Sequence, residues 1–351
     1  MLIKYETRPM KQSILTAMSV ILASMSAAFP RPALRPVVGD RLRTGLERLS
    51  KSAWLLVNPR TSLEVARLFA SPQLRPILRI EPRLMFKFLR EYLATDLSRK
   101  ERAAMLVHHY AFLKERVDPA FFPWIVEDRR ELSQVDGGGH VHRIWISFPR
   151  TPYSEGDLAL SFEVEGLDLY TLSFTIGPGT VAGVAADHAM YIARVQGKGR
   201  RLDRIRQATK DCQDVSPAAI LLAAAEGIAQ ALDLDLMVGI GAGIQVAPRR
   251  SQSDNLVKAY DEFWEAAGGL PVARQMYRLA VPSQEKSILE VKREHRSRTL
   301  RKRRFKEGHQ RAGARGLPPG GAARAQPWGS LALVGSNVLG DSCVSLGQAK
   351  G

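Results

Sequence analysis

Cysteine and long apolar runs are both scarce in this sequence. The chain of 351 residues has two cysteines, Cys212 and Cys343. Two cysteines cannot build a disulfide framework, and they cannot complete a zinc site by themselves. No apolar run reaches the roughly 18 to 20 residues that a membrane-spanning helix needs. These absences exclude a small disulfide-stabilised fold and any cysteine-based metal centre, and they favour the cytoplasm.

Acidic residues are also in deficit. The chain has 51 Lys and Arg against 35 Asp and Glu, a formal charge of +16. From Lys292 to the end there are 13 basic and 3 acidic residues, so most of the excess belongs to the run 292–304 and the tail behind it. Such a run is typical of a solvated helix end or a disordered arm. The alternative is contact with phosphate, on nucleic acid or on anionic lipid.

Both ends of the chain differ from its middle. Residues 1–36 contain an apolar stretch after Lys11 that is interrupted by serines, which predicts a helix; a cleaved signal with Met10 as the true start is the alternative. Residues 305–351 are rich in Gly, Ala, Pro and Arg and have little to bury, so this tail is predicted to be disordered.

Residues 37–130 carry apolar side chains at intervals of three and four, broken by prolines, which predicts several amphipathic helices. His108 and His109 fall within one of these helices. Adjacent helical positions point about 100° apart, so the two imidazoles cannot share a metal ion. We expect one packed, hydrogen-bonded histidine beside an exposed one, and no metal site.

Residues 131–304 are predicted to form an α/β domain. The period changes to two in 140–148, 158–166 and 169–177, which indicates sequential antiparallel strands. A further strand at 188–197 precedes the helix 216–235, which has Ser216 as its N-cap, and a short buried strand follows. The fold class is therefore α+β: an N-terminal helical region, then a mixed, mostly antiparallel sheet with packed helices.

A glycine-rich turn, RVQGKG at 194–199, joins the strand to the basic helix 200–210. Such a turn offers backbone N–H groups and a helix N-terminus to an anion. It resembles the pyrophosphate-binding turn of the acetyltransferase (GNAT) superfamily, which implies coenzyme A or acyl-CoA as ligand. The alternative is a structural turn in which glycine supplies a positive φ. The candidate ligand-binding residues are Arg194, Gln196, Gly197, Lys198, Gly199 and Arg200.

No acid–base pair stands out. Glu163 and Glu165 share one face of a strand and are typical of the wet face of an edge strand, or of a cation-binding pair. His188 is a candidate base without a visible partner, and Cys212 has no base nearby in sequence. The aromatic residues of YDEFWEAAGG (260–269) fall on one helix face and predict an anchor in the core.

Several ordered segments together resemble the VirK/YbjX family of Gram-negative bacteria. They are HHYAFL (108–113), LYTLSFTIG (169–177), YIARVQG (191–197), Thr209-Lys210, YDEFWEAAGG (260–269), YRLAVP (277–282) and KREHRSRTLRKR (292–303). The resemblance runs from about residue 45 to 304 and implies a role in virulence, resistance to cationic antimicrobial peptides and envelope maintenance. It also implies a location in the cytoplasm or peripheral to the inner membrane.

The resemblance supplies no catalytic residues, and the tail 305–351 has no counterpart in it. The residues suggest two functions. The first is binding of acyl-CoA or another phosphorylated ligand at 194–200, with a lipid precursor or a protein as substrate. The second is a non-enzymatic adaptor that docks on anionic membrane or RNA through the basic run. Sequence-specific DNA binding is disfavoured because no helix-turn-helix or finger pattern is present.

Overall fold

The computed structural model describes residue 50 and residues 53–149, 155–199, 201–246, 254–285 and 287–317. The first part is helical, as the three-to-four spacing predicts. Prolines occupy the first or second position of three of these helical elements, where a missing N–H costs nothing. The elements are α3 (Pro59–Phe69), η1 (Pro72–Leu74), α4 (Arg75–Ile80), η2 (Leu84–Leu89), α5 (Arg99–Arg116) and α6 (Phe121–Glu127).

The second part is a mixed sheet whose eight strands lie in the order β1-β2-β3-β4-β5-β6-β8-β7. All neighbouring pairs are antiparallel except β5 and β6, which are parallel. This confirms the predicted α+β class. The strands are β1 (Arg130–Gly137), β2 (His140–Ser147), β3 (Leu158–Val164), β4 (Leu167–Gly177), β5 (Ala189–Gly197), β6 (Leu236–Ile240), β7 (Leu270–Val272) and β8 (Met276–Ala280).

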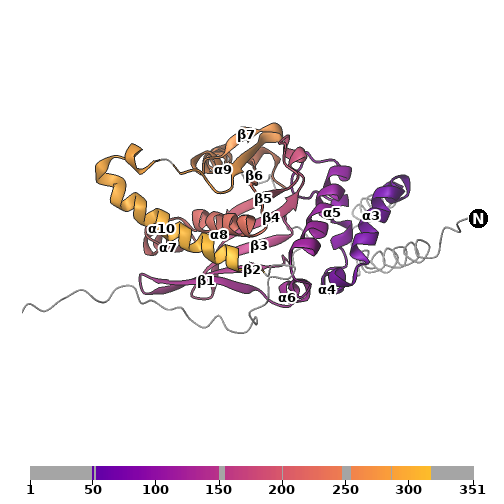
Figure 1. The fold of residues 1–351 in the computed structure, drawn as a ribbon, viewed down its shortest axis with the longest axis horizontal. Helices are drawn as coiled ribbons and strands as arrows, with labels where there is room; N and C mark the ends of the chain where they lie inside the picture. Colours follow the sequence, from indigo (N-terminus) through magenta and orange to yellow (C-terminus); the bar gives the residue numbers. More distant parts are fainter. Residues whose placement is uncertain are drawn as a thin grey trace, which may run out of the picture.

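Helices make the crossover that the parallel pair requires. Between β5 and β6 the chain forms α7 (Leu202–Asp211) and α8 (Pro217–Ala231). The Ser216 hydroxyl accepts a hydrogen bond from the Ala219 N–H and caps α8, as its sequence predicts. Helix α9 (Asp254–Ala266) then leads to the β7–β8 hairpin, and β8 lies between β6 and β7. The helices α3 to α6 gather at one end of the sheet (Figure 1).

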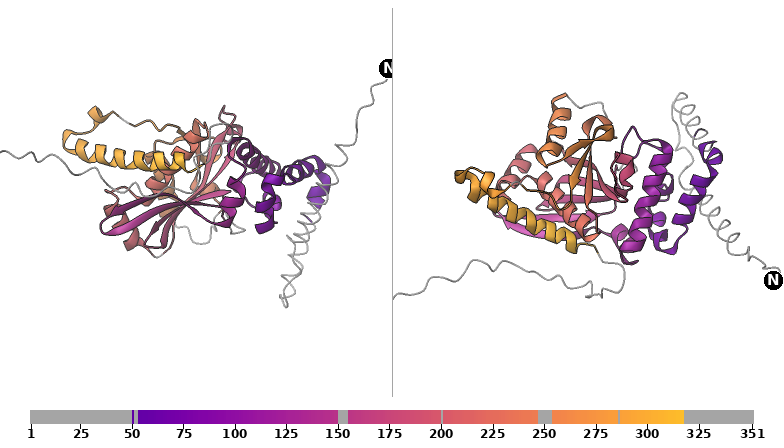
Figure 2. Two further views of the ribbon diagram at one scale, coloured as in Figure 1. Left: turned by 60° about the horizontal axis from the view of Figure 1, so that its bottom comes forward. Right: turned by 45° about the horizontal axis from the view of Figure 1, so that its top comes forward.

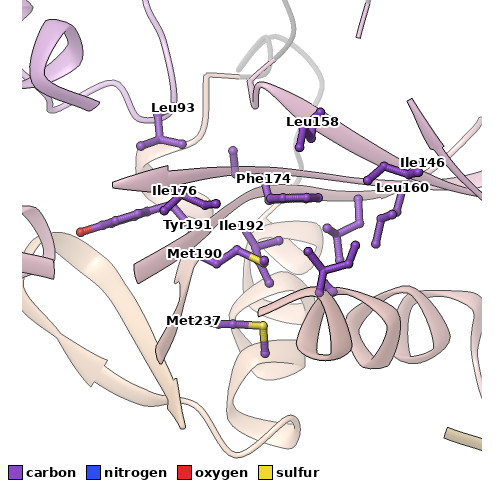
Figure 3. Close-up of a cluster of buried hydrophobic side chains, with 14 of the residues drawn as sticks. Leu93, Ile146, Leu158, Leu160, Phe174, Ile176, Met190, Tyr191, Ile192 and Met237 are labelled. Carbon is purple, nitrogen blue, oxygen red and sulfur yellow. The ribbon is translucent and has the colours of Figure 1, made fainter. Parts of the chain in front are cut away.

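One hydrophobic core runs through both parts. Leu160, Phe174 and Ile192 project from adjacent strands toward α8 (Figure 3). Helix α5 packs against the end of β4, where Gly177 leaves room for Met105, since a Cβ at that position would collide with the methionine. The first helices therefore bury part of their apolar surface against the sheet.

Helix α10 (Arg293–Arg315) lies along α8, as the views in Figure 2 also show. Two glycines allow the close approach: a Cβ at Gly227 would collide with the Gln310 carbonyl, and one at Gly313 with the Ala224 carbonyl. Composition predicts disorder from residue 305, but helix α10 continues to Arg315 because α8 offers a packing surface. The predictions for 1–36 and for 318–351 lie outside the described residues. Among the helices that are described, none combines the length and apolarity needed to cross a membrane.

Candidate functional site

The predicted turn lies where β5 ends and α7 begins. Gly197 is the last residue of β5, and the Lys198 N–H donates to the Leu169 carbonyl at 2.8 Å. Neither Gly197 nor Gly199 has a positive φ, so the structural alternative proposed for these glycines does not apply. A Cβ at Gly197 would lie 3.1 Å from both Ile205 and Tyr170, whereas Gly199 faces open space. The first glycine permits close packing and the second leaves the turn accessible.

The cations of the turn are arranged around Asp168, which sequence reasoning did not identify. The Lys198 ammonium lies 2.6 Å from the Asp168 carboxylate, and the Arg201 guanidinium donates to the Asp168 carbonyl at 2.7 Å. Arg201 precedes α7 and gives it no side-chain cap. The N–H groups of the first helical turn are therefore available to an anion, and the helix dipole favours one there. Arg200 lies outside the described residues.

A β-bulge decides where Arg194 and Gln196 point. Ser173 lies opposite Arg194 and Phe174 opposite Ile192, so Ala193 has no partner on β4. Consecutive residues of a strand face opposite sides of the sheet. Since Phe174 and Ile192 face the core, Arg194 is turned to the other face with Ser173, and exposed Gln196 follows it.

Beside the turn, one edge of β5 is unoccupied by β6. Among the described residues, β6 pairs only with Met190–Ile192, although β5 extends to Gly197. Beyond this pairing, the Val195 N–H donates to the hydroxyl of Tyr260 on α9 at 3.2 Å. The predicted aromatic anchor is Trp264, which is fully buried and donates to the Ile240 carbonyl. Tyr260 thus has a different role from Trp264, because it closes the free edge of β5.

The predicted histidine arrangement holds for His109, whereas His108 is half-buried and not exposed as expected. His109 is buried and accepts a hydrogen bond from the Ile176 N–H, and burial lowers its pKa to about 4. His188 has a partner after all: its Nδ1 lies 2.9 Å from Nε2 of half-buried His108. Helix α5 and the loop before β5 bring them together, a contact that no local pattern signals. Within the described residues, no group of three or more His, Cys, Asp or Glu is placed to hold a metal ion.

The expectation of a wet edge strand at Glu163 is wrong. Strand β3 lies inside the sheet, between β2 and β4, and Glu163 is buried with its carboxylate 2.5 Å from the Arg129 guanidinium. Glu165 instead occupies the turn after β3, where it accepts from the Val141 N–H. The two carboxylates do not form a cation-binding pair. Burial and the adjacent Asp211 raise the pKa of the Cys212 thiol to about 12, which favours its protonated, less reactive form.

The protein is therefore of the α+β class. A glycine turn joins β5, the first strand of the parallel pair, to helix α7. Residues 43–307 match the model of the family described as "Protein of unknown function (DUF535)". The chain belongs to this family, which confirms the resemblance to VirK/YbjX proteins. It is 27% identical over 256 residues to "Uncharacterized protein YbjX" of Escherichia coli K12, covering 70% of this chain and 76% of that protein. No solved structure matches it.

Proposed function

We propose that the protein binds acyl-CoA, or another ligand that ends in phosphate, at the turn formed by Gly197, Lys198 and Gly199. The observation that carries this proposal is the open turn followed by the uncapped N-terminus of α7. Backbone N–H groups and a helix dipole bind phosphate without any specific side chain. Lys198 and Arg201 add positive charge beside these amides.

The topology supports the coenzyme A form of this proposal. The turn follows the central strand of the sheet, which is also where the acetyltransferase superfamily holds the pyrophosphate of coenzyme A. Strand β5 leaves one edge unpaired by β6 next to the turn. An extended pantetheine arm carries amide groups that pair with a strand, so it can lie along this edge once the Tyr260 hydroxyl leaves the Val195 N–H.

A titration of the protein with acetyl-CoA in a calorimeter tests the proposal. Gly199→Asp places a negative charge beside the bound phosphate, and we expect affinity to fall about tenfold or more. Gly199→Ala is the matched control: its methyl group meets nothing within 4 Å, so affinity is retained. Absence of heat in the unmutated protein would overturn the proposal. Binding of pyrophosphate with the same affinity as acetyl-CoA would favour a different phosphorylated ligand.

In the cell, this activity would serve envelope maintenance and resistance to cationic antimicrobial peptides, with a lipid precursor as substrate. The support is membership of the VirK/YbjX family. A strain that lacks the gene is the test, complemented with either Gly199→Asp or Gly199→Ala. We expect only the alanine variant to restore growth in the presence of a cationic peptide. Equal rescue by both variants would mean that the cellular role does not depend on ligand binding at the turn.

A second candidate function is docking on an anionic membrane through α10. Exposed basic residues line this helix, including Arg293, Arg301 and Arg304, while others form ion pairs, such as Arg298 with Asp214. Deletion of the helix would uncover α8, so substitution is the better test. Arg301→Gln with Arg304→Gln should weaken co-sedimentation with phosphatidylglycerol vesicles. Arg75→Gln with Arg79→Gln, on exposed positions of α4, is the control. Equal binding of both variants would exclude α10 as the contact.

A further inference from the structure

Four polar side-chain atoms at one place in the fold have no hydrogen-bond partner among the described residues. They are Oε2 of Glu155, Oγ of Ser173, Nε of Arg194 and Nε2 of Gln245. Three of these residues are almost fully buried, with exposed fractions of 3% for Glu155, 4% for Ser173 and 7% for Gln245. An unpaired buried polar group is costly, so four together call for a partner that the described residues do not provide.

These side chains converge from separate segments. Ser173 on β4 lies directly opposite Arg194 on β5, on the face to which the bulge at Ala193 turns the arginine. Glu155 precedes β3, and its neighbour Gly156 lies against the backbone of Ser173 and Phe174, which places Glu155 beside Ser173. The Arg194 charge acts on Glu155, and Glu155 acts in turn on Tyr260. Gln245, at the end of η4 (Ala242–Ile244), also approaches the Tyr260 hydroxyl. We call Glu155, Ser173, Arg194 and Gln245 the polar cluster.

Arg194 of the polar cluster lies three residues before Gly197, the first residue of the turn. A strand rises about 3.3 Å per residue, so Arg194 is roughly 13 Å from Lys198 along β5. Tyr260 contacts β5 between the two, at Val195. A ligand that places its phosphates between the turn and the N-terminus of α7, and that displaces the Tyr260 hydroxyl from Val195, can run along β5 and bring its other end to the cluster. Half-buried Arg194 and Tyr260 connect the buried members to the surface.

The chemistry of the cluster selects the group that fits. Arg194, Gln245 and Ser173 each present a hydrogen-bond donor, and Oε2 of Glu155 presents an acceptor. An alkyl chain would leave all four unpaired. A carboxylate could accept from the donors, but it would lie against Glu155. A hydroxyl group accepts and donates at once, and so pairs with both sides of the cluster.

We infer that the polar cluster binds the acyl group of the ligand and that it selects an acyl group carrying a hydroxyl near the thioester. This inference rests on the proposed binding of acyl-CoA. Burial raises the pKa of Glu155 to about 7 against the opposing charge of Arg194. Near neutral pH the carboxyl group can therefore accept from the ligand hydroxyl as a carboxylate, or donate to it as an acid, without a permanent buried charge.

The test compares two ligands that differ by one hydroxyl, 3-hydroxybutyryl-CoA and butyryl-CoA, by calorimetry on the full chain at pH 7. We expect the hydroxylated ligand to bind about tenfold tighter or more, because a site built around a hydroxyl leaves polar groups unpaired when it is absent. Ser173→Ala and Gln245→Leu should each reduce this ratio severalfold and leave the affinity for unacylated coenzyme A unchanged. Glu265→Gln, on an exposed position of α9, is the control that retains the ratio.

The outcomes separate the two proposals. If coenzyme A binds but butyryl-CoA binds as tightly as its hydroxylated counterpart, the inference is overturned and the proposed function stands. A ratio that survives in both variants likewise overturns it, because the selectivity then arises elsewhere. If neither ligand nor coenzyme A binds, the proposed function fails, and the inference fails with it. Ser173→Ala removes a single oxygen atom, so it serves as the second variant should Gln245→Leu not fold.

Discussion

The Lys198 ammonium lies 2.6 Å from the Asp168 carboxylate, at the turn that we propose to bind phosphate. Asp168 is the second residue of β4, and Lys198 directly follows β5. The antiparallel pairing of β4 with β5 brings them together. The carboxylate holds the lysine beside the turn and also competes with any anion for it. Phosphate binding thus requires this ion pair to be shared or broken.

Replacing Asp168 with Asn should strengthen binding of acetyl-CoA severalfold, because Lys198 loses a competing negative charge that is only partly screened by solvent. Calorimetry at low salt measures the change. Glu115→Gln, on an exposed position of α5 far from the turn in sequence, is the control for a general change in net charge. Weaker binding in Asp168→Asn would show that Asp168 positions the lysine more than it competes for it.

A buried ion pair joins the helical part to the sheet. Lys87 on η2 lies 3.0 Å from Asp157, which also accepts from Thr175 and from the Tyr92 hydroxyl. Burial alone would raise the pKa of Asp157, but Lys87, His109 and these hydrogen bonds outweigh it and lower the pKa. Lys87→Met leaves the carboxylate buried without its cation. It should reduce the free energy of unfolding by about 3 kcal/mol or more in urea denaturation. A loss below about 1 kcal/mol would contradict this account of the pair.

Two buried histidines should make the protein less stable as the pH falls below about 6.5. Burial lowers the pKa of His109 and of His309 to about 4, so both stay neutral in the folded chain while they gain protons in the unfolded chain below about pH 6.5. These two histidines therefore lower the free energy of unfolding as pH drops from about 6.5 to 4, by up to about 3 kcal/mol each. Glu155 offsets part of this fall, because its pKa of about 7 lets the folded chain take up that proton first. Urea denaturation across this range gives the slope.

His109→Asn should make the slope shallower, since asparagine does not titrate and its carbonyl oxygen can accept from the Ile176 N–H in place of Nδ1. The unexposed His309, which bonds Ser133, keeps its own contribution in this variant. If the pH dependence of the free energy of unfolding stays unchanged in this variant, His109 binds protons equally in the folded and unfolded chains, which would contradict the prediction.

The contact of α10 with α8 should tolerate a methyl group at one glycine and not at another. Gly313→Ala places its Cβ against the Ala224 carbonyl, so the helices must separate, and we expect lower thermal stability and faster proteolysis within 293–317. Gly308 lies on the same helix with nothing near its would-be Cβ. Gly308→Ala should stabilise the protein by up to about 1 kcal/mol. Similar effects at both positions would contradict the packing of α10.

The sequence predicts the elements better than their contacts. Alternating apolar residues locate the strands, and Ser216 locates the start of α8, because both signals are local. The bulge at Ala193 is visible in the sequence only as a break in the alternation of apolar residues after Ile192. Regular alternation would place Arg194 on the core face with Ile192. Asp168 and the His108–His188 pair carry no local signal, since β-sheet pairing and helix packing create them.

The disorder predicted from residue 305 onward is a second case in which local sequence misses a tertiary contact. Glycine-rich composition lowers helix propensity, and by itself it predicts disorder. Glycines at 227 and 313 instead let two helices approach closely, so packing against α8 outweighs the unfavourable propensity of α10. Composition reports what a segment can do alone, and tertiary contact decides the rest.

Amide NMR of the ¹⁵N-labelled protein during titration with acetyl-CoA is the sharpest test of phosphate binding at the turn, because it locates the ligand as well as detecting it. The account predicts saturable shifts at Gly197, Lys198, Gly199 and the first turn of α7, with loss of these shifts in Gly199→Asp and their retention in Gly199→Ala. Binding that shifts other amides and leaves these unchanged, or no shifts at all, would contradict it.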